Sequence, residues 1–383
     1  MTKKRLPIGK DDFRRIREDE NYYVDKTLMI KDFIEYGDLV TLIPRPRRFG
    51  KTLNMNMLRD FFDITQDSHE IFDGLAIMKT EYADKINSVP VISLSFKNCT
   101  GDDVEALKKA IATEIRREYE KHFREISSKI RKYIRSIQQF QNVDGIEIRY
   151  NLYDRFLKIL ETPFNETIDD ELLKESLSIL GRTLYIIYGI RPIVLIDEYD
   201  NPIIEAHTRK FREKFMGFYS SFLTSILKGN LDLGQAVLTG IQRVAKESIF
   251  SKLNNIVVYN VLSKHYHQYF GLTREETSEL LDYYELDLNE KVKLHYDGYS
   301  FSGLDIYNPW SILNYANEQK LKPYWINTST NALIKESILG AERSFHRAFE
   351  KLIVGGEVAV SLNLVASFAE LPRTDTFVSV CQA

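Results

Sequence analysis

The stretch Leu42-Ile43-Pro44-Arg45-Pro46-Arg47-Arg48-Phe49-Gly50-Lys51-Thr52-Leu53 decides the fold of this chain. An apolar run over 39–43 leads into a turn rich in proline and arginine, and Gly50-Lys51-Thr52 then begins a helical pattern of apolar residues. A strand, a tight loop and a helix with Gly-Lys-Thr at the junction are typical of a phosphate-binding loop. There the backbone amides and the helix N-terminus bind phosphate oxygens, the lysine reaches the β- and γ-phosphates, and the threonine hydroxyl binds Mg²⁺.

The loop departs from the usual pattern at one position. That pattern has a glycine five residues before Gly50, and this chain has Arg45 there. Prolines flank the arginine on both sides, fix φ and bias the residues before them towards extended geometry. We therefore expect a rigid backbone to replace the flexibility that a glycine supplies. Arg45, Arg47 and Arg48 either contact phosphates or form ion pairs that point outward.

A pair of acidic residues follows the clearest strand in the chain. The run over 193–196 is apolar and mostly β-branched, which is typical of a parallel strand buried on both faces. Asp197 and Glu198 come next, and ligands of open α/β sheets bind at the carboxyl ends of the strands. We expect Thr52 and Asp197 to hold Mg²⁺ and Glu198 to orient and deprotonate the attacking water. The alternative is a pair of turn acids without a function.

Two further candidates lie at the end of a third predicted strand, 235–240. Thr239 is either a polar sensor near the γ-phosphate or a hydroxyl that is satisfied locally. Arg243 either stabilises transition-state charge or, as we favour, forms a structural salt bridge. Other kinds of site are not indicated. The histidines at 265 and 267 lack a metal-ligand pattern, and neither Gly-x-Ser-x-Gly nor Gly-x-Gly-x-x-Gly occurs.

The composition is that of an ordinary globular protein. Of 383 residues, 28% are charged and 44% are hydrophobic, and the net charge of −3 gives no general attraction to nucleic acid. Two cysteines, Cys99 and Cys381, exclude a disulfide framework and a cysteine-based zinc site. We expect no signal peptide, because no apolar segment follows the first residues, and the longest apolar stretch, 184–196, is too short to cross a bilayer. We expect a cytoplasmic protein without a membrane association.

The order of the predicted elements divides the chain into three segments. Residues 1–36 form an N-terminal helical segment, 37–270 form the phosphate-loop core, and 271–383 form a helical C-terminal region. A helical insertion at about 102–190 interrupts the core between its second and third strands. Basic and acidic residues mix along 108–135. We favour a solvated helix face there, with a nucleic-acid-binding face as the alternative.

A series of motifs also occurs in one order along the chain. The motifs are Leu6-Pro7-Ile8-Gly9, Tyr22-Tyr23-Val24-Asp25-Lys26-Thr27, Arg45 to Leu53, Leu195-Ile196-Asp197-Glu198-Tyr199-Asp200, Leu238-Thr239-Gly240-Ile241, Arg243-Val244-Ala245-Lys246-Glu247-Ser248 and Tyr296-Asp297-Gly298-Tyr299. The series resembles the bacterial AAA-ATPase-like family, which are P-loop ATPases akin to signal-transduction (STAND-type) NTPases. The resemblance covers roughly residues 5–320.

The resemblance implies a Walker A element without its first glycine. Lys51 and Thr52 match its phosphate and Mg²⁺ residues, and Asp197 and Glu198 match the Walker B acids. Many relatives also carry a nuclease-like domain of the PD-(D/E)XK type after the helical region. The last hundred residues here show no such pattern, so we expect a truncated or frame-shifted gene product. The residues expected to bind the nucleotide are Arg47, Arg48, Phe49, Gly50, Lys51, Thr52 and Leu53.

The sequence therefore predicts an α/β fold: a P-loop NTPase core with a mainly parallel sheet, a helical insertion and a helical C-terminal region. The predicted function is ATP binding with Mg²⁺-dependent hydrolysis. The protein would then be a nucleoside triphosphate hydrolase. The catalytic candidates are Glu198, Lys51, Thr239 and Arg243. Two alternatives stay open. One is a nucleotide-gated scaffold with negligible turnover, and the other is a nucleic-acid-binding module that uses the basic residues of 108–135.

Overall fold

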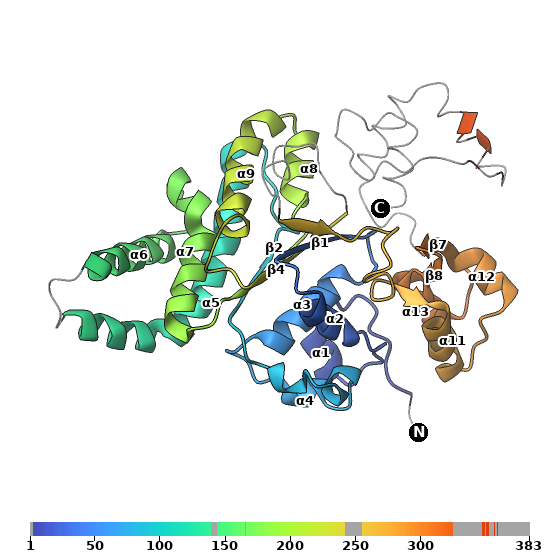
Figure 1. Ribbon diagram of the computed structural model, residues 1–383. Coiled ribbons are helices and arrows are strands. Elements are labelled where there is room, and N and C mark those ends of the chain that lie inside the picture. The colour runs from blue at the N-terminus through green and yellow to red at the C-terminus, as the bar shows by residue number, and fades with distance from the viewer. Residues whose placement is uncertain are drawn as a thin grey trace.

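The computed structural model describes residues 3–138, 144–164, 166–241 and 255–324, with isolated positions after 346. At its centre lies a five-stranded sheet with helices around it (Figure 1). All neighbouring strands are parallel, and their order is β2-β3-β4-β1-β5. The mainly parallel sheet predicted from the sequence is confirmed. The strands are β1 (Val40–Pro44), β2 (Val91–Ser95), β3 (Ile193–Asp197), β4 (Gln235–Gly240) and β5 (Ile256–Val258).

Both faces of this sheet are apolar. β1 and β3 are buried at every residue. Successive side chains of a strand point to opposite faces, so Val194 and Ile196 belong to one core cluster and Ile193 and Leu195 to the other. A parallel sheet of this kind needs helices on both faces to cover its apolar side chains.

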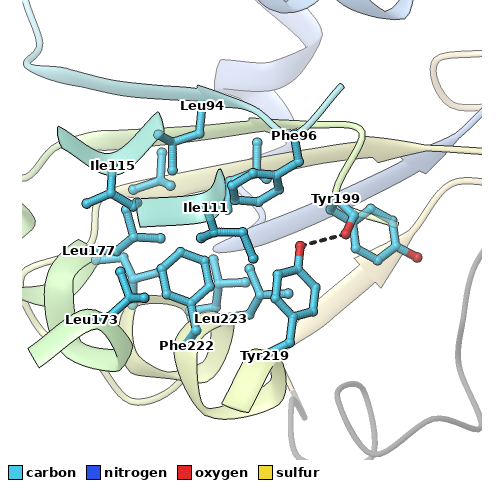
Figure 2. Packing of buried hydrophobic residues seen from close by; sticks show 14 of the residues in the cluster. Leu94, Phe96, Ile111, Ile115, Leu173, Leu177, Tyr199, Tyr219, Phe222 and Leu223 are labelled. Atoms are coloured by element: carbon cyan, nitrogen blue, oxygen red, sulfur yellow. Dashed lines mark hydrogen bonds between the residues drawn. The ribbon is translucent and has the colours of Figure 1, made fainter. Parts of the chain in front are cut away.

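Helices on one face come from the predicted insertion and from the segment after β3. The insertion lies between β2 and β3, as expected, and its helices α5 and α7 pack with α9 over the first cluster. Figure 2 shows this packing, in which Leu94 and Phe96 meet side chains such as Ile111, Leu177 and Phe222. The helices are α5 (Val104–Gln138), α6 (Asp144–Glu161), α7 (Asp170–Tyr188), α8 (Asn201–Thr208) and α9 (Arg212–Leu227).

The opposite face is covered by elements from the first part of the chain. The Asp12 carboxylate caps α1 by accepting a hydrogen bond from the Arg15 amide, and Gly37 ends α2 in a left-handed conformation with φ 64°. These elements pack on the second core cluster. They are α1 (Phe13–Glu18), α2 (Leu28–Tyr36), α3 (Lys51–Phe62), α4 (His69–Phe72) and the 3₁₀ turns η1 (Ala76–Lys79) and η2 (Ala83–Lys85).

The described part of the C-terminal region contains the predicted helices and also a small sheet. The three strands of this sheet are antiparallel, in the order β6-β8-β7. We predicted only aromatic-rich joints at these positions. Ser302 and Gly303 join β7 to β8 with φ 50° and 83°, a two-residue hairpin turn. The elements are β6 (Leu272–Thr273), α11 (Arg274–Tyr283), α12 (Glu290–Tyr296), β7 (Asp297–Phe301), β8 (Leu304–Tyr307) and α13 (Pro309–Glu318).

Several basic side chains of α5 are engaged within the protein. Arg116 is only 1% exposed and donates a 2.8 Å hydrogen bond to the Thr162 carbonyl at the end of α6. Others form ion pairs, as expected for a helix with mixed charges. The pairs are Arg117–Glu114 at 2.5 Å, Lys108–Asp170 at 2.7 Å and Lys121–Asp63 at 2.8 Å. Arg131 and Lys132 lie outside the residues whose side chains are described. Within the described ranges, no helix has the length and apolar character needed to cross a bilayer.

Candidate nucleotide site

The loop between β1 and α3 has a left-handed backbone at two positions. Arg48 has φ 68° and Gly50 has φ 81°. Such a conformation is natural for glycine but costs an arginine roughly 1–2 kcal/mol. Arg45 is not among the residues with positive φ, and its amide continues the β1–β4 ladder with a 3.0 Å hydrogen bond to the Gly240 carbonyl. The position of Arg45 therefore does not require a glycine.

Lys51 is a buried cation at the end of this loop. Its side chain begins α3, is 6% exposed, and reaches back across the loop. The ammonium donates hydrogen bonds of 2.8 Å to the carbonyls of Arg45 and Pro46. Burial lowers the pKa of Lys51, while the negative charge of Asp197 acts in the opposite direction. The lysine thus joins the two ends of the loop and places a positive charge beside the acidic strand end.

The Asp197 carboxylate accepts hydrogen bonds from side chains of α3 and of β4. β4 lies between β1 and β3, so the ends of all three strands meet at one edge. The Thr52 hydroxyl donates a 2.6 Å hydrogen bond to Asp197 Oδ2, and the Thr239 hydroxyl donates to Oδ1. The Glu198 amide also donates to Oδ1, at 3.0 Å. The structure therefore brings together Thr52, Asp197 and Thr239, which the sequence places up to 187 positions apart.

Glu198 has an unusual backbone and an unusual carboxyl group. Its φ of 52° is left-handed, which a non-glycine residue rarely adopts. Burial raises the pKa of the Glu198 carboxyl, and the charge of Asp197 raises it further. Strained residues and carboxyl groups with raised pKa values gather at functional sites. Both observations make Glu198 a candidate functional residue.

Asp200 belongs to the same edge, although we predicted no role for it from the sequence. It is 1% exposed, and its Oδ2 accepts a 2.8 Å hydrogen bond from the Ile241 amide. A Cβ on Gly240 would lie 2.6 Å from Asp200 Oδ1, so only glycine fits there. The carbonyl of Tyr199 accepts a 2.6 Å hydrogen bond from the Tyr219 hydroxyl, which ties this segment to α9 (Figure 2). The sequence signal was the second aspartate of Asp-Glu-Tyr-Asp.

The other residues that we predicted for the site lie on the surface, in the core or outside the described residues. Arg47 is exposed, whereas the guanidinium of Arg48 lies 4.1 Å from the centre of the Trp310 ring. Phe49 and Leu53 point into the apolar core, so only their backbone is available to a ligand. Arg243 lies outside the described residues.

The described residues contain no group of three or more His, Cys, Asp or Glu side chains that could hold a metal ion. A cation at this edge would have the Thr52 hydroxyl and the Asp197 carboxylate as protein ligands. Mg²⁺ is commonly bound in this way, by one or two protein oxygens together with phosphate and water. The donor set therefore fits Mg²⁺ that arrives with a nucleotide.

Comparison with known families assigns most of the chain to one family. A family model described as predicted AAA-ATPase matches residues 7–250. The match covers more than half of the chain and includes the loop, Asp197 and Thr239. The chain belongs to the AAA-ATPase-like family. In this AAA-ATPase-like protein, the matched segment stops before Trp310, although Trp310 contacts the loop.

A curated relative is longer than this AAA-ATPase-like chain. The two are 28% identical over 361 residues, which is 92% of this chain and 59% of the relative. The relative is described as an uncharacterized protein in the vnfD 5′ region of Azotobacter chroococcum mcd 1. The AAA-ATPase-like chain thus spans about three fifths of the length of that relative.

Proposed function

We propose that this chain binds ATP and hydrolyses it with the help of Mg²⁺. The observation that carries the proposal is the meeting of Lys51, Thr52 and Asp197 at one edge of the sheet, with the Thr52 hydroxyl 2.6 Å from the Asp197 carboxylate. Membership of a family described as predicted AAA-ATPase supports the same reaction.

The phosphates of the nucleotide and their Mg²⁺ ion have chemically suitable residues at this edge. The backbone amides of 47–53 and the N-terminus of α3 suit phosphate oxygens, and Lys51 supplies a positive charge. Thr52 and Asp197 offer the oxygen ligands that Mg²⁺ prefers. When bound, Mg²⁺ neutralises phosphate charge and so favours attack at phosphorus.

The protein's own contribution to hydrolysis is to place a water molecule and to accept its proton. We assign this role to Glu198, whose raised pKa brings it closer to neutral pH, where a general base works best. We assign Thr239 the role of orienting Asp197, because its hydroxyl donates a hydrogen bond to that carboxylate. Arg243 keeps its predicted role as a candidate for charge stabilisation or a salt bridge.

Calorimetric titration of ATP into wild type and two lysine variants tests the binding part. Lys51→Ala should lose measurable ATP binding, because it removes the buried ammonium group that would bind the phosphates. Lys293→Ala is the matched control, since Lys293 lies on an α12 turn where it pairs with Glu290 at 2.7 Å. Equal ATP affinity in wild type and Lys51→Ala would contradict the proposal.

A single-turnover assay separates hydrolysis from the scaffold alternative. Wild-type protein is mixed with a smaller amount of ATP in the presence of Mg²⁺. The released phosphate is then measured for hours. We expect one phosphate per bound ATP. Binding without phosphate release would favour the nucleotide-gated scaffold.

A further inference from the structure

Arg45, which stands at the usual glycine position, points its side chain towards residues of the C-terminal part of the chain. The side chain is fully buried. Its Nη1 donates hydrogen bonds of 2.8 Å to the Pro44 carbonyl and 2.7 Å to the Tyr259 carbonyl. The guanidinium also lies over two aromatic rings, 5.2 Å from the centre of Phe270 and 5.5 Å from that of Phe301. Arg45 therefore connects the loop to residues more than two hundred positions later.

This buried charge has no carboxylate partner in the described part of the chain. Two carbonyls and two ring faces are its recorded contacts, and Nε and Nη2 have no hydrogen-bond acceptor among the described residues. Burial lowers the pKa of Arg45 to about 9. Burying a cation without a carboxylate partner costs free energy. We therefore do not expect Arg45 to be there to stabilise the folded protein.

Other loop residues contact the same C-terminal segment. The Gly271 amide donates a 3.0 Å hydrogen bond to the Phe49 carbonyl. The Phe49 ring lies 4.8 Å from the Tyr299 ring and 5.6 Å from the Phe301 ring, measured between centroids. The Asn54 side chain, one turn into α3, donates a 2.9 Å hydrogen bond to the Tyr269 carbonyl. All of these partners lie beyond residue 250, where the family match ends.

We propose that Arg45 is a positioning residue that fixes the phosphate-binding loop against residues 259–307. This inference rests on the proposed function and deepens it. In the usual loop a glycine leaves the backbone free at this position. Here contacts with residues 259–307 hold the loop in its conformation. The small antiparallel sheet therefore lies next to the proposed nucleotide site. Nucleotide affinity therefore depends on residues that the family match does not include.

The guanidinium suits this role better than an ammonium would. Its flat face stacks on aromatic rings while its edge donates to two carbonyls. A lysine at the same position keeps the charge but has no planar face. Arg45→Lys should therefore loosen the loop without changing the net charge of the protein.

The experiment compares Arg45→Lys with Arg116→Lys by amide hydrogen exchange in the absence of nucleotide. Arg116 is a matched control because it is also buried, donates to the Thr162 carbonyl and lies 5.0 Å from the Phe164 ring centre. Segments 44–54 and 266–273 report on the loop contacts. In Arg45→Lys we expect exchange there to speed about tenfold or more, the factor for one lost hydrogen bond to a charged group. Arg116→Lys should leave both segments unchanged.

Titration of ATP into the same variants connects the loop to binding. We expect Arg45→Lys to bind ATP about tenfold more weakly and Arg116→Lys to bind like wild type, even if both melt at lower temperature. Arg45→Gly, which restores the usual motif, should also weaken binding. Stronger ATP binding by Arg45→Gly would overturn the inference.

The exchange result stands apart from the proposed function. If amide exchange in segments 44–54 and 266–273 is as slow in Arg45→Lys as in wild type, the positioning role is overturned, whatever the titration gives. If wild type binds no ATP but exchange rises in Arg45→Lys alone, the positioning role stands and the proposed function fails.

Discussion

The Thr52 hydroxyl lies 2.6 Å from the Asp197 carboxylate, although 145 positions separate the two residues in the chain. Thr52 is in the first turn of α3 and Asp197 is the last residue of β3. A hydroxyl and a carboxylate in this arrangement are suitable ligands for one small, hard cation. Because the contact depends on the register of β3, β4 and β1, it connects the sheet topology directly with the proposed chemistry.

The first prediction concerns the Mg²⁺ requirement. Thr52→Ala and Asp197→Asn should each raise the Mg²⁺ concentration for half-maximal ATPase activity by at least about tenfold, a loss typical of residues around a metal. Phosphate release measured across a Mg²⁺ series gives this value. Thr65→Ala is a control, because Thr65 donates its hydroxyl to a different aspartate, Asp63. An unchanged Mg²⁺ requirement in both site variants would contradict the assignment of ligands.

The second prediction separates binding from turnover at Glu198. Glu198→Gln should keep ATP affinity near the wild-type value and lower kcat by about 10²–10⁴-fold, the usual contribution of a general base. The measurement is kcat from steady-state phosphate release beside calorimetric affinity. A variant with wild-type kcat would remove Glu198 from the mechanism.

The pH dependence of wild-type turnover provides an independent check on Glu198. A general base must be ionised, and burial together with Asp197 raises the pKa of this carboxyl above its usual range. Activity should therefore increase as the pH rises through that raised pKa, with the acid limb of the kcat profile above the range of ordinary glutamates. Glu198→Gln should lack this limb. An acid limb that is the same in both proteins would assign it to another group.

The third prediction concerns Gly271, which lies against the phosphate loop. Its φ is +97°, and an added Cβ would meet Ile306 Cγ2 at 2.3 Å and Phe49 Cδ1 at 2.9 Å. Gly271→Ala combines backbone strain with overpacking, so it should lower the free energy of unfolding by roughly 2–4 kcal/mol. Gly189→Ala is the control, because Gly189 has φ +68° with nothing within 4 Å of the added atom. Urea unfolding curves that place both variants at equal stability would contradict the steric argument.

The sheet and much of the nucleotide edge could be predicted because their signals are local. A buried parallel strand is a short apolar run, and Asp197 and Glu198 follow such a run directly. The rule that ligands bind at the carboxyl ends of strands then joins this pair to Gly50-Lys51-Thr52. Thr239 needed one further step, because its hydrogen bond to Asp197 depends on β4 lying between the other two strands.

The remaining features depend on contacts that a sequence pattern does not contain. The conformation of Arg45 is set by Tyr259, Phe270 and Phe301, and nothing near position 45 indicates these partners. The small antiparallel sheet was missed because its strands are two to five residues long and rich in aromatic side chains. Its turn at Ser302-Gly303 was the available signal.

The last prediction concerns an ion pair that joins the N-terminal segment to α11. Lys26 is 6% exposed, and its ammonium lies 2.5 Å from the Glu276 carboxylate and 2.6 Å from the Gln268 carbonyl. Burial lowers the pKa of Lys26, and the charge of Glu276 opposes this effect. Glu276→Gln should destabilise more than Lys26→Met, because it leaves a buried ammonium without its counter-charge, whereas the remaining carboxylate is partly exposed to water.

A double-mutant cycle measures this coupling. Wild type, Lys26→Met, Glu276→Gln and the double variant are unfolded with urea under the same conditions. The double variant should lose less stability than the sum of the single variants, with a coupling of about 1–3 kcal/mol. The side chain of Glu276→Gln keeps an oxygen that can accept the hydrogen bond from the Thr273 amide at the start of α11. The coupling energy therefore measures the loss of the charge and not the loss of the helix cap. Additive losses to within about 0.5 kcal/mol would mean that the pair does not hold the two segments together.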